Sequence, residues 1–442
     1  MLKVFSLFGL AVMIGIGVVL SVNRKGIKWT PVLWGLGLQF LFGLILIIPA
    51  VQNFFFVVVD DGVRVLLSFA EQGASFVFGS FSGYNLMDGD GQPVNVGPGS
   101  VGAPMLNLAF WVLPTIVFFS SLMSVLYHLG VMQWLVYAIA WVMQRTMRTS
   151  GAESLSAAAN IFVGQTEAPL VVKPYIQKMT RSELHAIMTG GFATVAGGVM
   201  AAYVQFLEGS IDGIAGHLVT ASILSAPAAL AISKVMYPED GQPVTLTTLD
   251  MNTEKSARNV LEAAAQGAAE GGRLAINVAA MLIAFVGLIA MADWLLTLIP
   301  IVFCEGGVSM GYDGTCEPLT LSTILGWLFA PLALAMGVPW AEAGLVGTLL
   351  GEKLVLTEFV AYLHLGQIMQ ETPEALSPRS AVIASYALCG FANFASIGIQ
   401  LGGIGGLAED RMGDLAELGF RAMIAGSLAA FMTATVAGVL LV

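Results

Sequence analysis

The sequence has few charged residues and few of the residues that build metal or redox sites. Only 11% of its 442 residues are charged, and it contains four histidines and three cysteines. The histidines are scattered and no CxxC pattern occurs, which argues against zinc or haem. No Walker motif is present, so nothing indicates an ATP-driven pump. With 57% hydrophobic residues and a mean hydropathy of +0.83, the chain cannot cover a soluble surface of this size and is predicted to be an integral membrane protein.

Apolar runs of roughly 18 to 25 residues repeat along the chain, which is the length a helix needs to cross about 30 Å of hydrocarbon. Barrel strands would instead appear as short alternating segments. Residues 4–21 end at a basic stretch, residues 24–28, without the usual small-residue cleavage site. We therefore expect a retained first span with its C-terminal end in the cytoplasm, a lipid bilayer around the chain and, at a net charge of −11, no nucleic-acid partner.

The order of these runs predicts an all-α membrane protein with about eight transmembrane helices, two re-entrant helical hairpins and several interfacial helices. The expected spans are residues 4–21, 31–51, 105–127, 183–206, 217–235, 275–299, 380–401 and 415–441. The expected hairpins are residues 154–176 and 340–367, and the expected interfacial or surface helices are residues 131–147, 257–270 and 319–336. Residues 60–104 are expected to form an external segment of loops and short amphipathic pieces.

Two halves of the chain have related patterns. Gly191 to Ala196 and Gly390 to Ala395 share four of six residues, and each follows a hairpin with a polar tip. Because one copy is expected to start inside and the other outside, the pattern is typical of inverted-topology repeats. We divide the chain accordingly into N-terminal helices and external segment (1–104), scaffold and interfacial helix (105–147), first repeat (148–236), cytoplasmic helix, scaffold helix and cysteine loop (237–318) and second repeat (319–442).

The hairpin tips contain acids within apolar sequence. A buried carboxylate costs about 2.5 to 3.5 kcal/mol even on lenient membrane-insertion scales, so Glu167 and Glu358 are predicted to bind something. Gln165, Thr166 and Glu167 offer donors and acceptors suited to the edge of a heterocyclic base. Glu358 with Asn393 and Ser396 is suited to vicinal hydroxyls. A sugar joined to a base would span both clusters.

Other interpretations of these residues stay open. Ion pairing with Lys173 or Lys353 would make the two acids structural, and the hydroxyl and amide side chains would serve in helix packing alone. A channel would place polar residues in rings along a pore. A membrane-embedded enzyme would use the two acids as an acid and base pair.

These segments resemble a known family, the concentrative nucleoside transporters. The resemblance lies in residues 160–170, 352–362 and 390–406, and it extends over approximately residues 105–442. The N-terminal spans fit the short bacterial form of the family. The resemblance implies nucleosides of the uridine, cytidine and adenosine class as substrates, sodium as the coupling ion with no other cofactor, no enzyme activity, a homotrimer, an elevator-like motion and a bacterial inner-membrane location.

The resemblance also implies roles for particular residues. It implies nucleobase contacts at Gln165, Thr166 and Glu167, ribose contacts at Glu358, Asn393 and Ser396, and apolar walls at Phe391 and Leu282. It implies a sodium site made of the side chains of Asn160 and Thr194 and the carbonyls of Val163 and Val195. The bacterial pattern has serine where Thr194 stands, and the hydroxyl is kept. Coupling to protons is the alternative, since some bacterial members use them.

The three cysteines have no assigned chemistry. Cys304 and Cys316 bracket a glycine-rich acidic loop, where a disulfide and two free thiols are equally compatible with the sequence. Cys389 lies in an apolar run and is expected to pack in the core.

Overall fold

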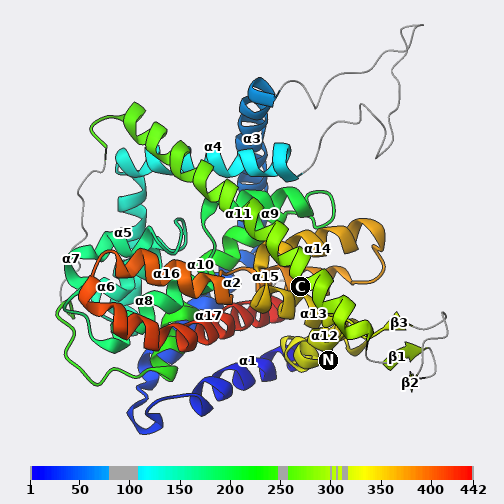
Figure 1. Ribbon diagram of the computed structural model, residues 1–442. Helices are drawn as coiled ribbons and strands as arrows, with labels where there is room; N and C mark the ends of the chain where they lie inside the picture. Colours follow the sequence, from blue (N-terminus) through cyan, green and yellow to red (C-terminus); the bar gives the residue numbers. More distant parts are fainter. Residues whose placement is uncertain are drawn as a thin grey trace, which may run out of the picture.

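The protein is described here by a computed structural model, which covers residues 2–78, 108–246, 257–298, 301–304, 307–310 and 317–440. Helices account for nearly all of these residues, and Figure 1 shows them gathered around a central group of α8, α10, α15 and α17. The all-α fold with bent and re-entrant helices is confirmed. Residues 79–104 of the expected external segment and Cys316 lie outside the described residues, so the cysteine pairing stays open.

Three helices form the N-terminal part: α1 (Leu2–Val19), α2 (Trp29–Ile47) and α3 (Pro49–Phe78). α1 packs along α17 and α12, and α2 packs against α10. The prediction of loops from residue 60 was wrong as far as Phe78, because α3 is one helix of 30 residues. It starts with a proline at a position where the missing N–H is tolerated, and Arg64 pairs with Asp60 one turn earlier at 3.2 Å.

Before the first repeat come a short π-helical turn, η2 (Leu108–Val112), and the helices α4 (Leu113–His128) and α5 (Val131–Met147). α5 departs from α4 at 77°, as expected for a helix that does not continue the span. Gly130 makes this bend with a φ of 86°, a conformation that glycine adopts without strain. Hairpin 1 follows and consists of α6 (Gly151–Ala159), η3 (Ala168–Val172) and α7 (Lys173–Ile176).

The first broken helix comes next and consists of α8 (Arg181–Ala193) and α9 (Gly197–Leu207). Residues 194–196 between them are extended rather than helical. The repeat ends with the buried helix α10 (Ile214–Met236). The predicted hairpin at residues 154–176 and the helical segments predicted at residues 183–206 and 217–235 are therefore found, the first of these segments being broken at residues 194–196.

Between the repeats lies α11 (Val260–Thr297), one helix of 38 residues. The prediction of a separate surface helix at residues 257–270 was wrong, because the glycines there serve packing and do not interrupt the helix. A Cβ at Gly267 would lie 2.6 Å from the Ser120 carbonyl oxygen, and one at Gly271 would lie 2.8 Å from the Val117 Cα. These two glycines, four residues apart, let α4 approach the backbone of α11 closely.

The expected cysteine loop contains a small antiparallel sheet of β1 (Ile301–Cys304), β2 (Gly307–Met310) and β3 (Glu317–Pro318), with strand order β2-β1-β3. Ile301 pairs with Met310 and Val302 with Pro318. Sequence reasoning predicted a loop here, and this sheet contains the only β-strands among the described residues. Figure 1 shows it at the periphery, beside α12 and α13.

The second repeat has the same order of parts. α12 (Leu321–Met336) meets α13 (Trp340–Val355) at 116°, and α13 with α14 (Glu358–Glu371) forms hairpin 2. The second broken helix consists of α15 (Pro378–Leu388) and α16 (Phe394–Gly405), followed by the short turn η4 (Glu409–Arg411) and α17 (Met412–Leu440).

Length and composition identify the helices that suit a bilayer. Among the described residues, five helical stretches are long and apolar enough to cross, or up to seven if each of the two bent pairs is one span. α1 and α16 are shorter apolar helices, and the predicted total of about eight spans stays a prediction. Helices α8, α10 and α17 pack on one another at the centre, and α11 lies on the outside along α4 (Figure 1).

Candidate functional site

The breaks of the two discontinuous helices cross in the middle of the protein. Gly390 has a φ of 140°, and a Cβ there would lie 2.7 Å from the Phe192 carbonyl oxygen, so only glycine permits this approach. The Phe391 N–H donates to the Thr194 carbonyl across the crossing at 3.3 Å. The Gly197 N–H donates to the Phe162 carbonyl at 3.1 Å, which ties the hairpin 1 tip to the first break. Three irregular segments, the two breaks and the hairpin 1 tip, therefore meet where unpaired backbone groups and polar side chains are available.

Glu358 lies in this region at the first position of α14 and is only 4% exposed. Its Oε1 accepts a hydrogen bond from the Tyr203 hydroxyl at 2.9 Å, and its Oε2 accepts one from Asn393 Nδ2 at 2.9 Å. Tyr203 is stacked on Tyr362 with ring centroids 4.1 Å apart, which fixes the hydroxyl. Each carboxylate oxygen thus has one donor and retains lone pairs for another.

Asn393 and Ser396 are placed by the start of α16. Asn393 is the N-cap residue, and its Oδ1 accepts from the Ser396 N–H at 2.8 Å. Because this oxygen is occupied by a backbone donor, the Asn393 amide nitrogen faces Glu358. The three residues predicted to contact ribose are therefore brought together.

Of the three predicted nucleobase contacts, Gln165 is joined directly to this group. Its Nε2 donates to Ser396 Oγ at 3.3 Å. Thr166 lies against α16, where a Cβ at Gly403 would be 2.6 Å from its Cγ2. Glu167 is exposed, so the prediction of a buried carboxylate holds for Glu358 but not for Glu167, whereas Gln165 is buried. The hairpin 1 tip thus places the Gln165 amide inside the protein and the Glu167 carboxylate beside it at an accessible position.

The two predicted apolar walls are placed differently. Phe391 is half-buried in the second break and bonds through its backbone to the first. Leu282 is buried on α11, the helix that packs along α4, and so comes from outside the two hairpins and broken helices. The prediction for Leu282 stays a prediction.

The predicted sodium ligands surround the end of α6 and the break after α8. Asn160 Nδ2 donates to the Ser156 carbonyl at 3.0 Å, whereas its fully buried Oδ1 has no hydrogen-bond partner among the described residues. Thr194 Oγ1 donates to the Gly190 carbonyl at 2.9 Å, which leaves its lone pairs free. A Cβ at Gly190 would lie 3.2 Å from Asn160 Nδ2, so both side chains approach the same residue. A buried amide oxygen without a donor, near a hydroxyl and unwound backbone, fits a small cation.

Structural ion pairs do not account for the two tip acids. No ion pair among the described residues joins Glu358 to Lys353 or Glu167 to Lys173. The buried Lys353 instead donates to the Ala387 carbonyl at 2.8 Å. That bond supports the C-terminal end of α15, just before the second break.

Sequence reasoning missed two polar side chains of the site. Tyr203 is the donor to Glu358, and Gln400 donates through Nε2 to Gln165 Oε1 at 3.0 Å. Tyr203 lies in an apolar run, and nothing in the neighbouring sequence indicates that it belongs to the site. Gln400 follows Ser396 by four residues and therefore shares its helix face, which is a signal that could have found it.

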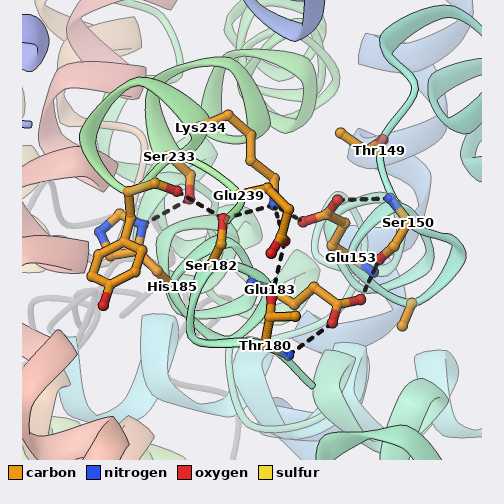
Figure 2. Close-up of polar contacts among 12 residues, drawn as sticks. Thr149, Ser150, Glu153, Thr180, Ser182, Glu183, His185, Ser233, Lys234 and Glu239 are labelled. Carbon is orange, nitrogen blue, oxygen red and sulfur yellow. Dashed lines mark hydrogen bonds and ion pairs between the residues drawn. The ribbon is translucent and has the colours of Figure 1, made fainter. Parts of the chain in front are cut away.

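A second buried polar cluster, the hairpin 1 base, joins the starts of α6 and α8 to the end of α10 (Figure 2). Lys234 lies between two carboxylates, with its Nζ 2.7 Å from Glu153 Oε2 and 3.3 Å from Glu239 Oε2. Ser150, the N-cap of α6, donates to Glu183 Oε1 at 2.6 Å, and Glu183 in turn caps α8. These bonds fix hairpin 1 to the first broken helix at the end opposite its tip.

The chain matches models of known protein families along most of its length. Three family models match in order: "Na+ dependent nucleoside transporter N-terminus" over residues 8–81, "Nucleoside recognition" over residues 109–209 and "Na+ dependent nucleoside transporter C-terminus" over residues 217–438. The chain belongs to the sodium-dependent nucleoside transporter family. The resemblance inferred from its sequence is confirmed.

Relatives of this transporter extend along nearly its whole length. It is 44% identical to an uncharacterized transporter of Haemophilus influenzae over 437 residues, covering 98% of this chain and 96% of the relative. It is 40% identical to sodium/nucleoside cotransporter 1 of Mus musculus over 438 residues, covering 96% of this chain and 61% of that protein. The chain thus spans about three-fifths of the length of the mammalian relative.

Solved structures of CNTnw share the fold of this transporter. An inward-facing substrate-bound state matches with a TM-score of 0.85 at 41% identity, covering 100% of this chain and 98% of that one. A CNTnw variant in an outward-facing state matches with a TM-score of 0.84 at 41% identity and the same coverage. The fold is therefore that of proteins solved in states facing either side.

Proposed function

We propose that the protein is a symporter that imports nucleosides together with sodium. The observation that best supports this is the line of hydrogen bonds from Gln165 through Ser396 and Asn393 to Glu358, buried where the two helix breaks cross. It places amide and hydroxyl groups beside a carboxylate. This row of hydrogen-bonding side chains suits an uncharged molecule with a base at one end and hydroxyls at the other.

Within this proposal Glu358 accepts hydrogen bonds from ribose hydroxyls, and Asn393 and Ser396 assist. Gln165, with Thr166 and Glu167 beside it, contacts the nucleobase. Phe391 and Leu282 form apolar walls. Charged hydrogen bonds are the strong ones, so most of the ribose affinity rests on Glu358.

Sodium binds, in this proposal, to the Asn160 and Thr194 side chains with the Val163 and Val195 carbonyls. The partnerless Asn160 Oδ1 supports this site, since it is a buried acceptor that a cation would satisfy. One cation entering with a neutral nucleoside gains about 2.3 kcal/mol from 100 mV and about 1.4 kcal/mol from a tenfold gradient. Together these allow accumulation of a few hundredfold.

We propose further that the two hairpins and two broken helices move as one transport domain against α4, α11 and neighbouring helices, in a homotrimer in the bacterial inner membrane. The exposed length of α11 supports a scaffold role, because an apolar helix so little covered within one chain is suited to lipid or to other subunits. Rigid-body gating around a fixed site is the general behaviour of inverted-repeat transporters.

The deciding experiment is uptake of radiolabelled uridine and adenosine into proteoliposomes, with sodium and proton gradients imposed separately. The proposal expects saturable accumulation driven by the inward sodium gradient, and label recovered as intact nucleoside. Uptake driven by protons alone would reassign the coupling ion. Non-saturable equilibration would indicate a channel, and chemically altered label an enzyme.

A further inference from the structure

Gln400 on α16 is fully buried and has two hydrogen-bond acceptors within reach. Its Nε2 donates to the Met188 carbonyl at 3.1 Å and to Gln165 Oε1 at 3.0 Å. We infer that Gln400 is a positioning residue that fixes which end of the Gln165 amide faces the nucleobase, and thereby influences base selectivity. This inference rests on the proposed function, in which Gln165 contacts the base.

The direction of these bonds is set by the backbone. The Met188 carbonyl only accepts, so the Gln400 amide must turn its nitrogen, and not its oxygen, toward α8. With that nitrogen in place, its second hydrogen points at Gln165. Gln165 must then present its oxygen to Gln400, because two facing NH2 groups would repel.

The same direction continues toward the ribose group. Since its oxygen is held by Gln400, the Gln165 amide nitrogen faces Ser396 and donates to its hydroxyl. One hydrogen of that nitrogen remains for a ligand, and the Ser396 hydroxyl proton is likewise free to donate. At Gln165 the site therefore offers a donor to the base, not an acceptor.

Both glutamine side chains pack closely against the backbone of α8. Gly191 on α8 lies against both: a Cβ there would be 2.8 Å from Gln400 Nε2 and 2.9 Å from the Gln165 Cβ. Two glutamines from different repeats thus meet over a glycine in the broken helix. An alanine at Gly191 would displace the Gln400 amide and the Gln165 side chain without removing either.

A fixed donor favours a base that presents a carbonyl over one that presents an amino group at the same position. Uridine and cytidine differ in this way at one ring position, and inosine and adenosine at another. Loss of Gln400 would let the Gln165 amide rotate and present its oxygen, which accepts from an amino group. The expected change in preference is that of one neutral hydrogen bond, roughly 2- to 10-fold.

The test measures kcat/KM for uptake of the four nucleosides in proteoliposomes made with the wild-type protein and with Gln400→Met. We expect the uridine-to-cytidine ratio, the inosine-to-adenosine ratio, or both to fall roughly 2- to 10-fold in the variant. Gly191→Ala should shift the same ratio in the same direction. It supplies the answer if Gln400→Met does not yield a monodisperse protein.

Gln39→Met is the matched control, because Gln39 is also fully buried and also donates twice, to the Leu224 carbonyl and to Thr433 Oγ1, but on α2. It should leave both ratios unchanged. An equal loss for all four nucleosides in Gln400→Met and Gly191→Ala would overturn the inference and leave Gln400 a packing residue. Absence of nucleoside uptake by the wild-type protein would instead overturn the proposed function itself.

Discussion

Replacing Glu358 with glutamine removes a charge from the site while keeping its hydrogen bonds. The introduced amide can turn its oxygen toward Asn393 Nδ2 and its nitrogen toward the Tyr203 hydroxyl, which also accepts. No buried polar group is left without a partner, so the fold should be kept. What is lost is the negative acceptor for the ribose hydroxyls.

The size of the effect follows from the strength of a charged hydrogen bond. Such a bond contributes about 1.5 to 3 kcal/mol, so Glu358→Gln should lower kcat/KM for uridine uptake by roughly 10- to 150-fold. The loss should be much smaller for 2′,3′-dideoxyuridine, which lacks the hydroxyls. Sodium-driven uptake in proteoliposomes measures both.

Glu371→Gln is the matched control, because Glu371 is the exposed last residue of the same helix, α14. It should transport uridine like the wild-type protein. Near-normal uridine uptake by Glu358→Gln, or an equal loss for uridine and its dideoxy analogue, would refute the assignment of Glu358 to the ribose.

Three other substitutions test other parts of the structure. Asn160→Ala should raise the sodium concentration for half-maximal uptake about tenfold or more, with uptake recovered at high sodium; an unchanged sodium response would remove Asn160 from the ion site. Lys234→Met leaves the buried Glu153 and the partly buried Glu239 without their cation and should lower the free energy of unfolding by about 3 to 5 kcal/mol, measured by denaturation in detergent; an unchanged stability would show that the cluster is not ionised. Gly390→Ala should lower the melting temperature and uptake together, because its φ of 140° is strained for alanine and its Cβ would meet the Phe192 carbonyl; wild-type behaviour would mean that the two breaks do not cross as described.

Sequence reasoning succeeded where a local pattern has one physical cause. Polar residues within apolar runs indicated the hairpin tips, and the glycine-containing segments after them indicated broken helices, because both features are costly in a bilayer unless protein or ligand satisfies them. That the two breaks cross was not predicted. It failed at residues 257–270, which were predicted to form a separate surface helix but continue into α11, where Gly267 and Gly271 allow close packing of α4. A glycine in a membrane helix can either interrupt the helix or allow another helix to pack closely, and only the position of the partner helix distinguishes the two.

The partners of the site residues were harder to predict than the residues themselves. Tyr203 and Glu358 are joined across 155 positions of the sequence, and Gln400 and Gln165 across 235. Neither pair shares a helix, so helical periodicity does not relate one member to the other. Chemistry alone identifies a carboxylate that needs a donor, but the fold decides which donor it meets.

The crossing of the two breaks also bears on how an ion and a nucleoside would be coupled. Thr194, a proposed sodium ligand, accepts through its carbonyl from the N–H of Phe391, a proposed wall of the nucleoside site. An ion that orders the first break would therefore order the segment beside the nucleoside, and the nucleoside would do the reverse. Coupling free energies are reciprocal, so sodium should tighten nucleoside binding by the same factor by which nucleoside tightens sodium binding. This backbone bond between the two proposed sites gives that coupling a direct structural route.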